Sequence, residues 1–227
     1  MLKRLLTRLS RAESVPPTLS SVDAYARWAA VYPARAHNAL MQCEQEALLE
    51  LLPPLEGAIM LDLACGTGRY GLLAGERGAR RVIALDNSLP MLTAAELPLR
   101  ALASVEQIPL ADQSVDGVIC ALALGHLPSL DRAVEEIGRT LKRGGWALIS
   151  DFHPLLDTRG ARRTFSVEGR QYAVEHYPHR HADYVRAAGA AGLMLEDVRE
   201  PALAPELIAQ GAASGPVVII YRLRRAE

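Results

Sequence analysis

The stretch that decides the fold is AIMLDLACGTGRYG, residues Ala58–Gly71. Its first residues form an apolar run of strand length that ends near an acid, and glycines follow this run. This pattern is typical of a buried parallel strand that turns into a helix, and it predicts a strand over 58–63, a turn at Gly66 and Gly68, and a helix from about Arg69. Glycines let a ligand approach the backbone, and a helix start offers unpaired N–H groups. We therefore expect a ligand-binding turn here.

Two acids beside this turn discriminate between ligands. The spacing of Gly66, Gly68 and Gly71 matches the dinucleotide fingerprint, and Asp86 follows about 20 residues on, where a ribose-binding acid is expected. Asp62 argues against NAD, because a carboxylate in this crevice would repel a pyrophosphate. The same carboxylate suits a ligand with an ammonium and a sulfonium, such as S-adenosylmethionine (SAM). An NAD dehydrogenase remains the disfavoured alternative.

At this point the chain resembles the class I, Rossmann-like SAM-dependent methyltransferases of the small-molecule type, type 11-like relatives of ubiquinone- and biotin-pathway enzymes. LDLACGTGRYG resembles their first motif, and ALDNS (Ala84–Ser88) resembles their second. The resemblance implies that SAM is the cofactor and S-adenosylhomocysteine (SAH) the product. It also implies an α/β fold with a seven-stranded, mostly parallel sheet in the order 3-2-1-4-5-7-6, whose seventh strand is antiparallel.

The composition limits the class of protein. A chain of 227 residues with 50% hydrophobic content is long enough for one core with a small cap. The net charge of −1, with no dense basic block beyond the N-terminus, predicts a small-molecule substrate and no nucleic-acid partner. Three cysteines without CxxC spacing indicate neither disulfides nor a metal site, so we expect a cytoplasmic protein. No apolar run reaches the roughly 20 residues of a membrane span. The oligomeric state stays open, a homodimer included.

The order of elements supports the parallel sheet, because apolar strands alternate with helical segments. We expect helices over 69–77, 89–97, 130–141 and 181–191. The expected strands are 58–63, 81–85, 100–105, 117–124, 146–151, 194–199 and 217–223.

The segments outside the core are expected to cover the site. A basic amphipathic helix is predicted over 1–12. Helices within 21–52, the second of them running from about Ala34 to Leu52, resemble the lid of such enzymes. A small hairpin around Glu168 and Gly169 is predicted in an insertion after strand five. The expected division is an N-terminal helical lid (1–55), a SAM-binding core (56–153), a substrate-covering insertion (154–186) and the C-terminal part of the sheet (187–227).

The donor is expected along the carboxyl ends of the first three strands. Asp62 would face its ammonium and Asp86 its ribose hydroxyls, while Asn87 would contact the adenosine or cap the turn. The segment SVEQIP (104–109) resembles the adenine-binding segment, although Ser104 stands where many relatives have Asp. The expected cofactor-binding residues are Asp62, Ala64, Gly66, Gly68, Asp86, Asn87, Ser104, Val105 and Glu106.

Two histidines follow strands four and five, where a base could reach the acceptor. His126 and His153 have a suitable ordinary pKa for general-base catalysis, although each could equally bond to loop backbone. The candidate substrate-binding residues are Tyr25, Trp28, Arg170 and Tyr172.

The sequence thus predicts methyl transfer from SAM to a small molecule, with oxygen favoured as the acceptor atom and nitrogen or carbon still open. One alternative is a malonyl-thioester (acyl carrier protein) O-methyltransferase of the biotin-pathway type. It would need a carboxylate-binding arginine, with Arg159, Arg162, Arg163 and Arg170 as unranked candidates. The other is a protein that binds SAM or SAH without catalysis.

Overall fold

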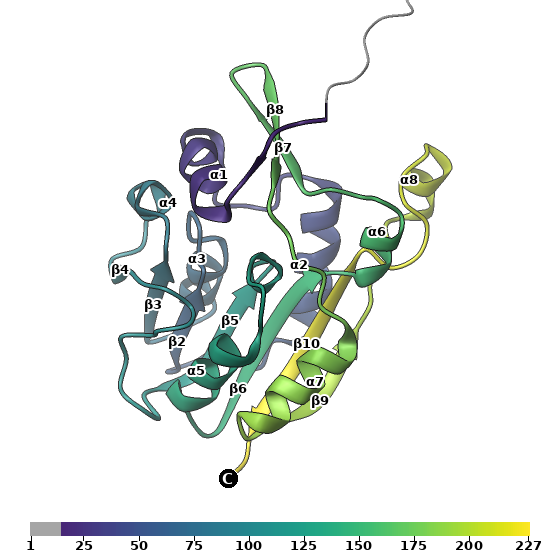
Figure 1. Ribbon diagram of the computed structural model, residues 1–227. Helices are drawn as coiled ribbons and strands as arrows, with labels where there is room; N and C mark the ends of the chain where they lie inside the picture. The colour runs from purple at the N-terminus through teal and green to yellow at the C-terminus, as the bar shows by residue number, and fades with distance from the viewer. Residues whose placement is uncertain (1–14) are drawn as a thin grey trace, which may run out of the picture.

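A central sheet of seven strands organises the computed structural model, which describes residues 15–227 (Figure 1). The helix expected over 1–12 lies outside these residues. The strand order is β4-β3-β2-β5-β6-β10-β9, which confirms the predicted 3-2-1-4-5-7-6. The strands are β2 (Ile59–Leu63), β3 (Arg81–Asp86), β4 (Arg100–Leu102), β5 (Val115–Ala121), β6 (Leu141–Phe152), β9 (Leu193–Arg199) and β10 (Val218–Arg225).

The carboxyl ends of the parallel strands share one edge of this sheet. β2 pairs in parallel with β3 and β5, and β6 pairs in parallel with β5. Only β10 runs antiparallel to its neighbours in the sheet, with Ile219 opposite Asp151 of β6. The parallel strands therefore end together at the edge where a ligand site is expected.

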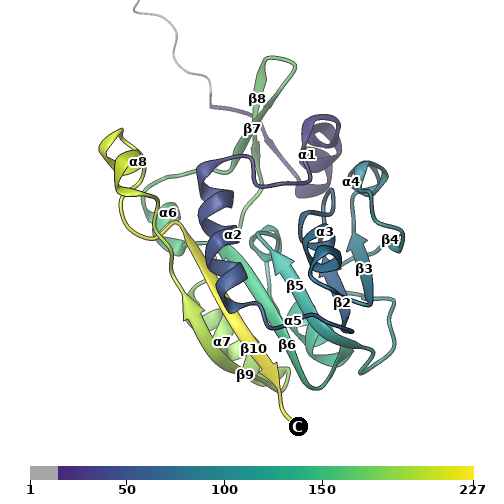
Figure 2. The ribbon, with the colours of Figure 1, turned by 180° about the vertical axis from the view of Figure 1, so that it is seen from behind.

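Helices cover both faces of the sheet: α2 and α3 lie on one face, and α5 and α7 lie on the other (Figures 1 and 2). Short helices connect the remaining elements. The helices are α1 (Ser21–Trp28), η2 (Ala29–Val31), α2 (Ala39–Leu51), α3 (Arg69–Glu76), α4 (Leu89–Ala94), η3 (Leu124–His126), α5 (Asp131–Thr140), α6 (Pro154–Thr158), α7 (His181–Ala190) and α8 (Pro205–Ala209).

The core consists of two apolar layers, because alternate strand residues point to opposite faces. In β2, Met60 packs with α2 and α3, whereas Leu61 packs with α5 and α7. Leu148 and Ile149 of β6 divide in the same way, and both are fully buried. This explains why the strands read as continuous apolar runs.

Some boundaries differ from those expected. The strand predicted over 100–105 ends at Leu102, because Ser104 forms a turn in which its hydroxyl accepts the N–H of Glu106 at 3.1 Å. The helix expected from about residue 34 begins at Ala39, where the Asn38 side chain accepts the N–H of Met41 at 2.9 Å. Such an N-cap fixes where a helix begins, whatever the apolar pattern before it. Helices α6 and α8 have no counterpart among the predictions.

A structure that we call the lid lies above the carboxyl ends of the strands (Figure 1). It consists of β1 (Thr18–Leu19), α1, η2 and the hairpin of β7 (Thr164–Val167) and β8 (Arg170–Val174). β1 pairs in parallel with β8, so the N-terminal segment and the insertion form one sheet. The predicted hairpin is present, and Glu168 and Gly169 at its tip both have positive φ, as a type I′ turn requires.

No helix within residues 15–227 has the length and apolar character needed to cross a membrane.

Candidate functional site

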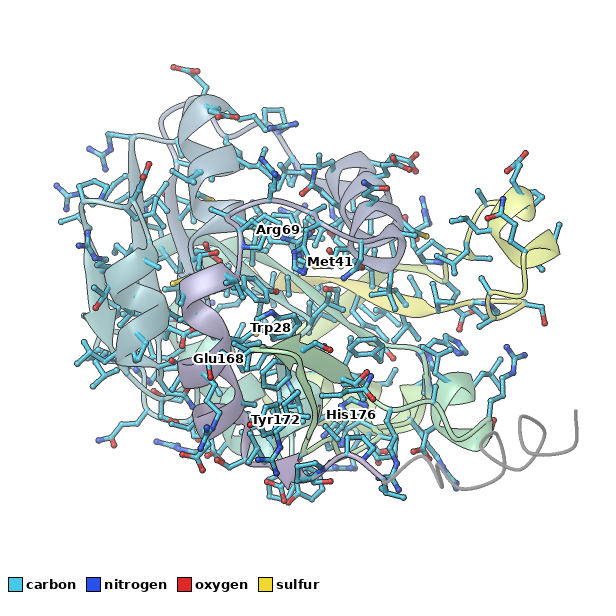
Figure 3. The ribbon with its side chains drawn as sticks, turned by 90° about the horizontal axis from the view of Figure 1, so that it is seen from above. Trp28, Met41, Arg69, Glu168, Tyr172 and His176 are labelled. Atoms are coloured by element: carbon cyan, nitrogen blue, oxygen red, sulfur yellow. The ribbon has the colours of Figure 1, made fainter. Side chains whose placement is uncertain are left out.

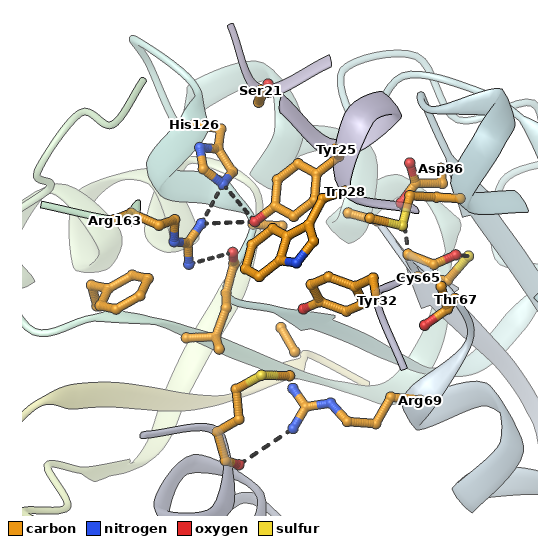
Figure 4. A pocket seen from close by; sticks show the side chains of 18 of the residues that line it. Ser21, Tyr25, Trp28, Tyr32, Cys65, Thr67, Arg69, Asp86, His126 and Arg163 are labelled. Carbon is orange, nitrogen blue, oxygen red and sulfur yellow. Dashed lines mark hydrogen bonds between the residues drawn. The ribbon is translucent and has the colours of Figure 1, made fainter. Parts of the chain in front are cut away.

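A cavity of about 490 Å³ lies between the lid and the carboxyl ends of the strands (Figure 4). Its size is typical of small-molecule sites, and its position is the usual one for ligands of open α/β sheets. The predicted site residues that line it are Tyr25, Trp28, Asp62, Ala64, Gly66, Asp86, Asn87, Val105 and His126.

Three predicted donor residues do not line this cavity. Gly68 has φ +92°, and a Cβ there would lie 2.8 Å from the Leu97 side chain, so its glycine serves the turn and its packing. Ser104 holds the backbone of Glu106, as described above. The Glu106 side chain is exposed, and the backbone carbonyl of Glu106 accepts a hydrogen bond from Nε of Arg132 at 3.2 Å.

Two predicted substrate residues lie on the lid, away from the cavity wall. Tyr172 stacks on Phe165 at 5.5 Å between ring centroids, and the Arg170 guanidinium lies 5.2 Å from the Tyr172 ring. Trp28 stacks on Phe165 at 4.8 Å and also lines the cavity. Seen from above, Trp28 lies between Arg69 on one side and Tyr172 on the other (Figure 3). Trp28 thus both packs the lid and faces the site.

Asp62 at the end of β2 is buried and holds the start of α3. Its Oδ2 accepts the N–H of Gly71 at 2.7 Å, and a Cβ on Gly71 would lie 3.0 Å from that oxygen. Burial raises the pKa of Asp62 to about 7, although the Gly71 N–H and the charge of Arg69 act in the opposite direction. The carboxyl group can therefore gain its full charge when a cationic group binds beside it.

Asp86 at the end of β3 connects two turns. Its Oδ2 accepts the N–H of Gly66 and its Oδ1 accepts the N–H of Ser88, both at 2.8 Å. Burial raises the pKa of Asp86, while these N–H groups act to lower it. Each carboxylate oxygen can accept a further bond, so Asp86 is preorganised for two hydroxyl groups of a ligand. Ala64 and Gly66, in the turn between β2 and α3, both have positive φ.

Arg69, a lining residue that the sequence did not identify, forms a buried ion pair. Its Nη2 lies 2.9 Å from Oε2 of Glu44 on α2, and Oε1 of Glu44 accepts the Ser150 hydroxyl at 2.7 Å. Burial acts to lower the pKa of Arg69, but the Glu44 carboxylate outweighs it and the pKa is raised. The pair connects α2, α3 and β6 directly beneath the cavity.

A second polar group contains Tyr25, His126 and Arg163. Arg163 donates to Nε2 of His126, to the Tyr25 hydroxyl at 3.4 Å and to the Leu122 carbonyl at 2.8 Å (Figure 4). The Tyr25 hydroxyl lies 3.2 Å from the same Nε2. Sequence patterns named Arg163 only as one of four candidate arginines, and the structure places it in the cavity wall.

His153 lies outside the large cavity. Its Nδ1 accepts the N–H of Leu155 at 3.2 Å and caps α6, which leaves the proton on Nε2, 3.1 Å from Oε1 of Glu200. It lines a small second cavity of about 40 Å³ behind Phe152 and Arg163.

Proteins with sequences similar to this chain include methyltransferases. Residues 61–149 match the family described as methyltransferase domain. The malonyl-[acyl-carrier protein] O-methyltransferase of Pectobacterium atrosepticum is 36% identical over 129 residues, covering 54% of this chain and 49% of that protein. That of Serratia marcescens is 35% identical over 132 residues, covering 56% and 51%. The chain thus spans about half the length of these relatives.

Solved structures share the fold. A SAM-dependent methyltransferase of Mesorhizobium loti has a TM-score of 0.68 at 23% identity, covering 81% of this chain and 98% of that one. The magnesium protoporphyrin IX methyltransferase of Synechocystis PCC 6803, solved with bound SAH, has a TM-score of 0.64 at 19% identity, covering 91% and 95%. Residues 61–149 of this chain thus resemble a methyltransferase domain, and the described chain has the fold of the solved SAM-dependent methyltransferases named above.

Proposed function

We propose that the protein transfers the methyl group of SAM to an oxygen atom of a small-molecule acceptor. The observation that carries this proposal is a single cavity that joins the glycine turn to the lid. Asp62, Gly66 and Asp86 line one part of it, and Tyr25 and Arg163 line another. Donor and acceptor can therefore meet in one cavity.

The proposed donor placement follows the polar groups of the cavity. Asp62 faces the ammonium group, Asp86 accepts the two ribose hydroxyls, and the Val105 N–H meets the adenine ring. The sulfonium then lies near the lid. Methyl transfer is a displacement at a carbon that the sulfonium already activates, so the protein contributes chiefly by holding the two reactants in line.

A second candidate is a malonyl-thioester O-methyltransferase, which two relatives named above favour. Of its four candidate arginines, only Arg162 and Arg163 line the cavity. Arg159 donates to the Ser214 carbonyl, and Arg170 lies over Tyr172. Turnover of a malonyl thioester would support this candidate, and binding of SAH without any turnover would support the non-catalytic alternative.

Calorimetry with SAH and NAD tests the ligand. We expect SAH to bind and NAD to give no signal, because Asp62 beside the turn repels a pyrophosphate. A screen of small acceptors with methyl-labelled SAM then tests transfer. Tight binding of NAD together with no response to SAH would contradict the proposed function.

The affinity for SAH is expected to rise with pH. With a pKa of about 7, Asp62 in the free protein is largely protonated at about pH 5.5 and largely ionised at about pH 7.5. The ligand's ammonium binds the ionised form, so protonation opposes binding by up to about tenfold per pH unit below the pKa. Calorimetry at these two pH values should show an affinity at least about tenfold higher at the upper one. Asp62→Asn, which cannot titrate, should bind weakly at both, and an equal wild-type affinity at both values would remove this role of Asp62.

A further inference from the structure

Arg163 places a positive charge in the acceptor part of the cavity. Its guanidinium is held by the three acceptors described above and lies 4.1 Å from the centre of the Phe152 ring. None of the ion pairs formed within residues 15–227 includes it. A partly buried cation is costly unless an anion compensates it. The cavity wall is therefore suited to a negatively charged group.

The partners of Arg163 are neutral. Nδ1 of His126 lies 2.7 Å from the Glu175 carbonyl, which can only accept, so Nδ1 carries the proton and Nε2 is the acceptor. Tyr25 then donates its hydroxyl proton to this Nε2. Burial and, to a lesser extent, the charge of Arg163 lower the pKa of His126 to about 2, although the Glu175 carbonyl acts in the opposite direction. Burial also keeps the Tyr25 hydroxyl neutral by raising its pKa.

The groups that face His126 come from three elements: Tyr25 from α1, Arg163 from the segment before β7, and His176 from the segment after β8. The His176 ring lies 6.2 Å from the His126 ring, and burial lowers its pKa as well. None of these groups stabilises a protonated His126. Its Nε2 lone pair is moreover already used by Arg163 and Tyr25, so His126 is poorly placed to remove a proton from an acceptor.

We propose that the acceptor binds as an anion, with a carboxylate held by Arg163, and that one of its oxygens is methylated without any base from the protein. This inference rests on the proposed methyl transfer and names its substrate class. A lone pair of the carboxylate oxygen forms the new O–CH₃ bond. The S–CH₃ bond breaks and its electron pair stays on sulfur, so the sulfonium becomes the thioether of SAH. The carboxylate becomes a neutral ester, and no proton is released.

In this arrangement His126 is a positioning residue. Its Nε2 fixes the direction of the Arg163 fork and of the Tyr25 hydroxyl, and the Glu175 carbonyl fixes the ring. A planar guanidinium matches a carboxylate in a way that an ammonium does not. Arg163 thus selects the acceptor by both charge and shape.

Proton release separates the two acceptor chemistries. Methylation of a hydroxyl liberates one proton for each methyl group, whereas methylation of a carboxylate liberates none. The test screens pairs of carboxylic acids and the primary alcohols of the same skeleton with labelled SAM, at about pH 7.5 in weak buffer with a pH indicator. We expect the label in acids alone, with no proton signal. Label in the alcohols with stoichiometric acid release would overturn the proposal.

Variants test the roles of the two residues with the best acid from that screen. Arg163→Gln should raise KM for the acid about 10- to 100-fold, which is the usual contribution of hydrogen bonds to a charged group. The KM of Arg163→Lys should lie between that of Arg163→Gln and that of the wild type. SAH binding checks that each variant is folded. Arg159→Gln is the matched control, because this arginine at the end of α6 donates to the Ser214 carbonyl and does not line the cavity. Equal KM values for Arg163→Gln and the control would refute the anion site.

His126→Gln keeps an acceptor oxygen near the position of Nε2 but cannot act as a base. At saturating SAM we expect kcat to fall less than about tenfold, the cost of a neutral hydrogen bond, with an unchanged pH profile between about pH 6 and 8. A loss of about 100-fold or more would show that His126 is a base after all. Failure of the wild type to bind SAH would instead contradict the proposed function itself, so the two failures are distinguishable.

Discussion

Replacing Glu44 by Gln is expected to lower the free energy of unfolding by about 3 to 5 kcal/mol, because it leaves the Arg69 charge buried without its partner. The Glu44 side chain is fully buried, and that of Arg69 is 9% exposed. The carboxylate also accepts the Ser150 hydroxyl. Urea unfolding of both proteins, compared at unchanged slope, measures this loss.

Two further variants show whether the loss comes from the unpaired charge. The exposed pair of Arg186 and Asp131, at 2.6 Å, is a control of similar geometry, and Asp131→Asn should cost far less than Glu44→Gln because solvent screens this pair. The double variant Glu44→Leu with Arg69→Met removes both charges and should recover most of the stability. If Glu44→Gln costs no more than Asp131→Asn, the buried pair does not stabilise the fold.

The sheet and the donor side of the site could be predicted because their signals are local in sequence. The apolar run before Asp62 and the glycines after it lie within one short stretch, and Asp86 ends the next strand. Parallel strands must bring such strand ends together at one edge, so position along the chain predicts position in space. The structure places both acids in the cavity.

The acceptor side could not be predicted in the same way, because it depends on contacts between distant segments. His126 and Arg163 meet only because the lid closes over the end of β5, and no local pattern relates an arginine of the insertion to that loop. The lid itself depends on a two-residue pairing between β1 and β8, which is too short to leave a periodic signal. The arginine-rich insertion indicated a charge there but not which arginine faces the cavity.

Asp86→Ala should weaken SAH binding by about 100-fold or more. The carboxylate is expected to accept both ribose hydroxyls, and each hydrogen bond to a charged group contributes about 1.5 to 3 kcal/mol. Calorimetry with SAH at about pH 7.5 measures the change. The substitution also leaves the N–H groups of Gly66 and Ser88 without their acceptor, so a loss of stability must be separated from a loss of contact.

Asp116 provides that separation, because its carboxylate also holds a backbone N–H but lies at the amino end of β5, away from the cavity. It accepts the N–H of Ile59 at 2.8 Å and pairs with Lys142 at 2.7 Å. Asp116→Ala should therefore reduce stability while leaving SAH affinity within about twofold of the wild type, since nothing it holds faces the ligand. If both variants bind SAH as the wild type does, Asp86 does not hold the ribose and serves only the turns. If both weaken binding equally, affinity follows general stability. Only a loss of SAH affinity that is confined to Asp86→Ala would show that Asp86 binds the ribose hydroxyls.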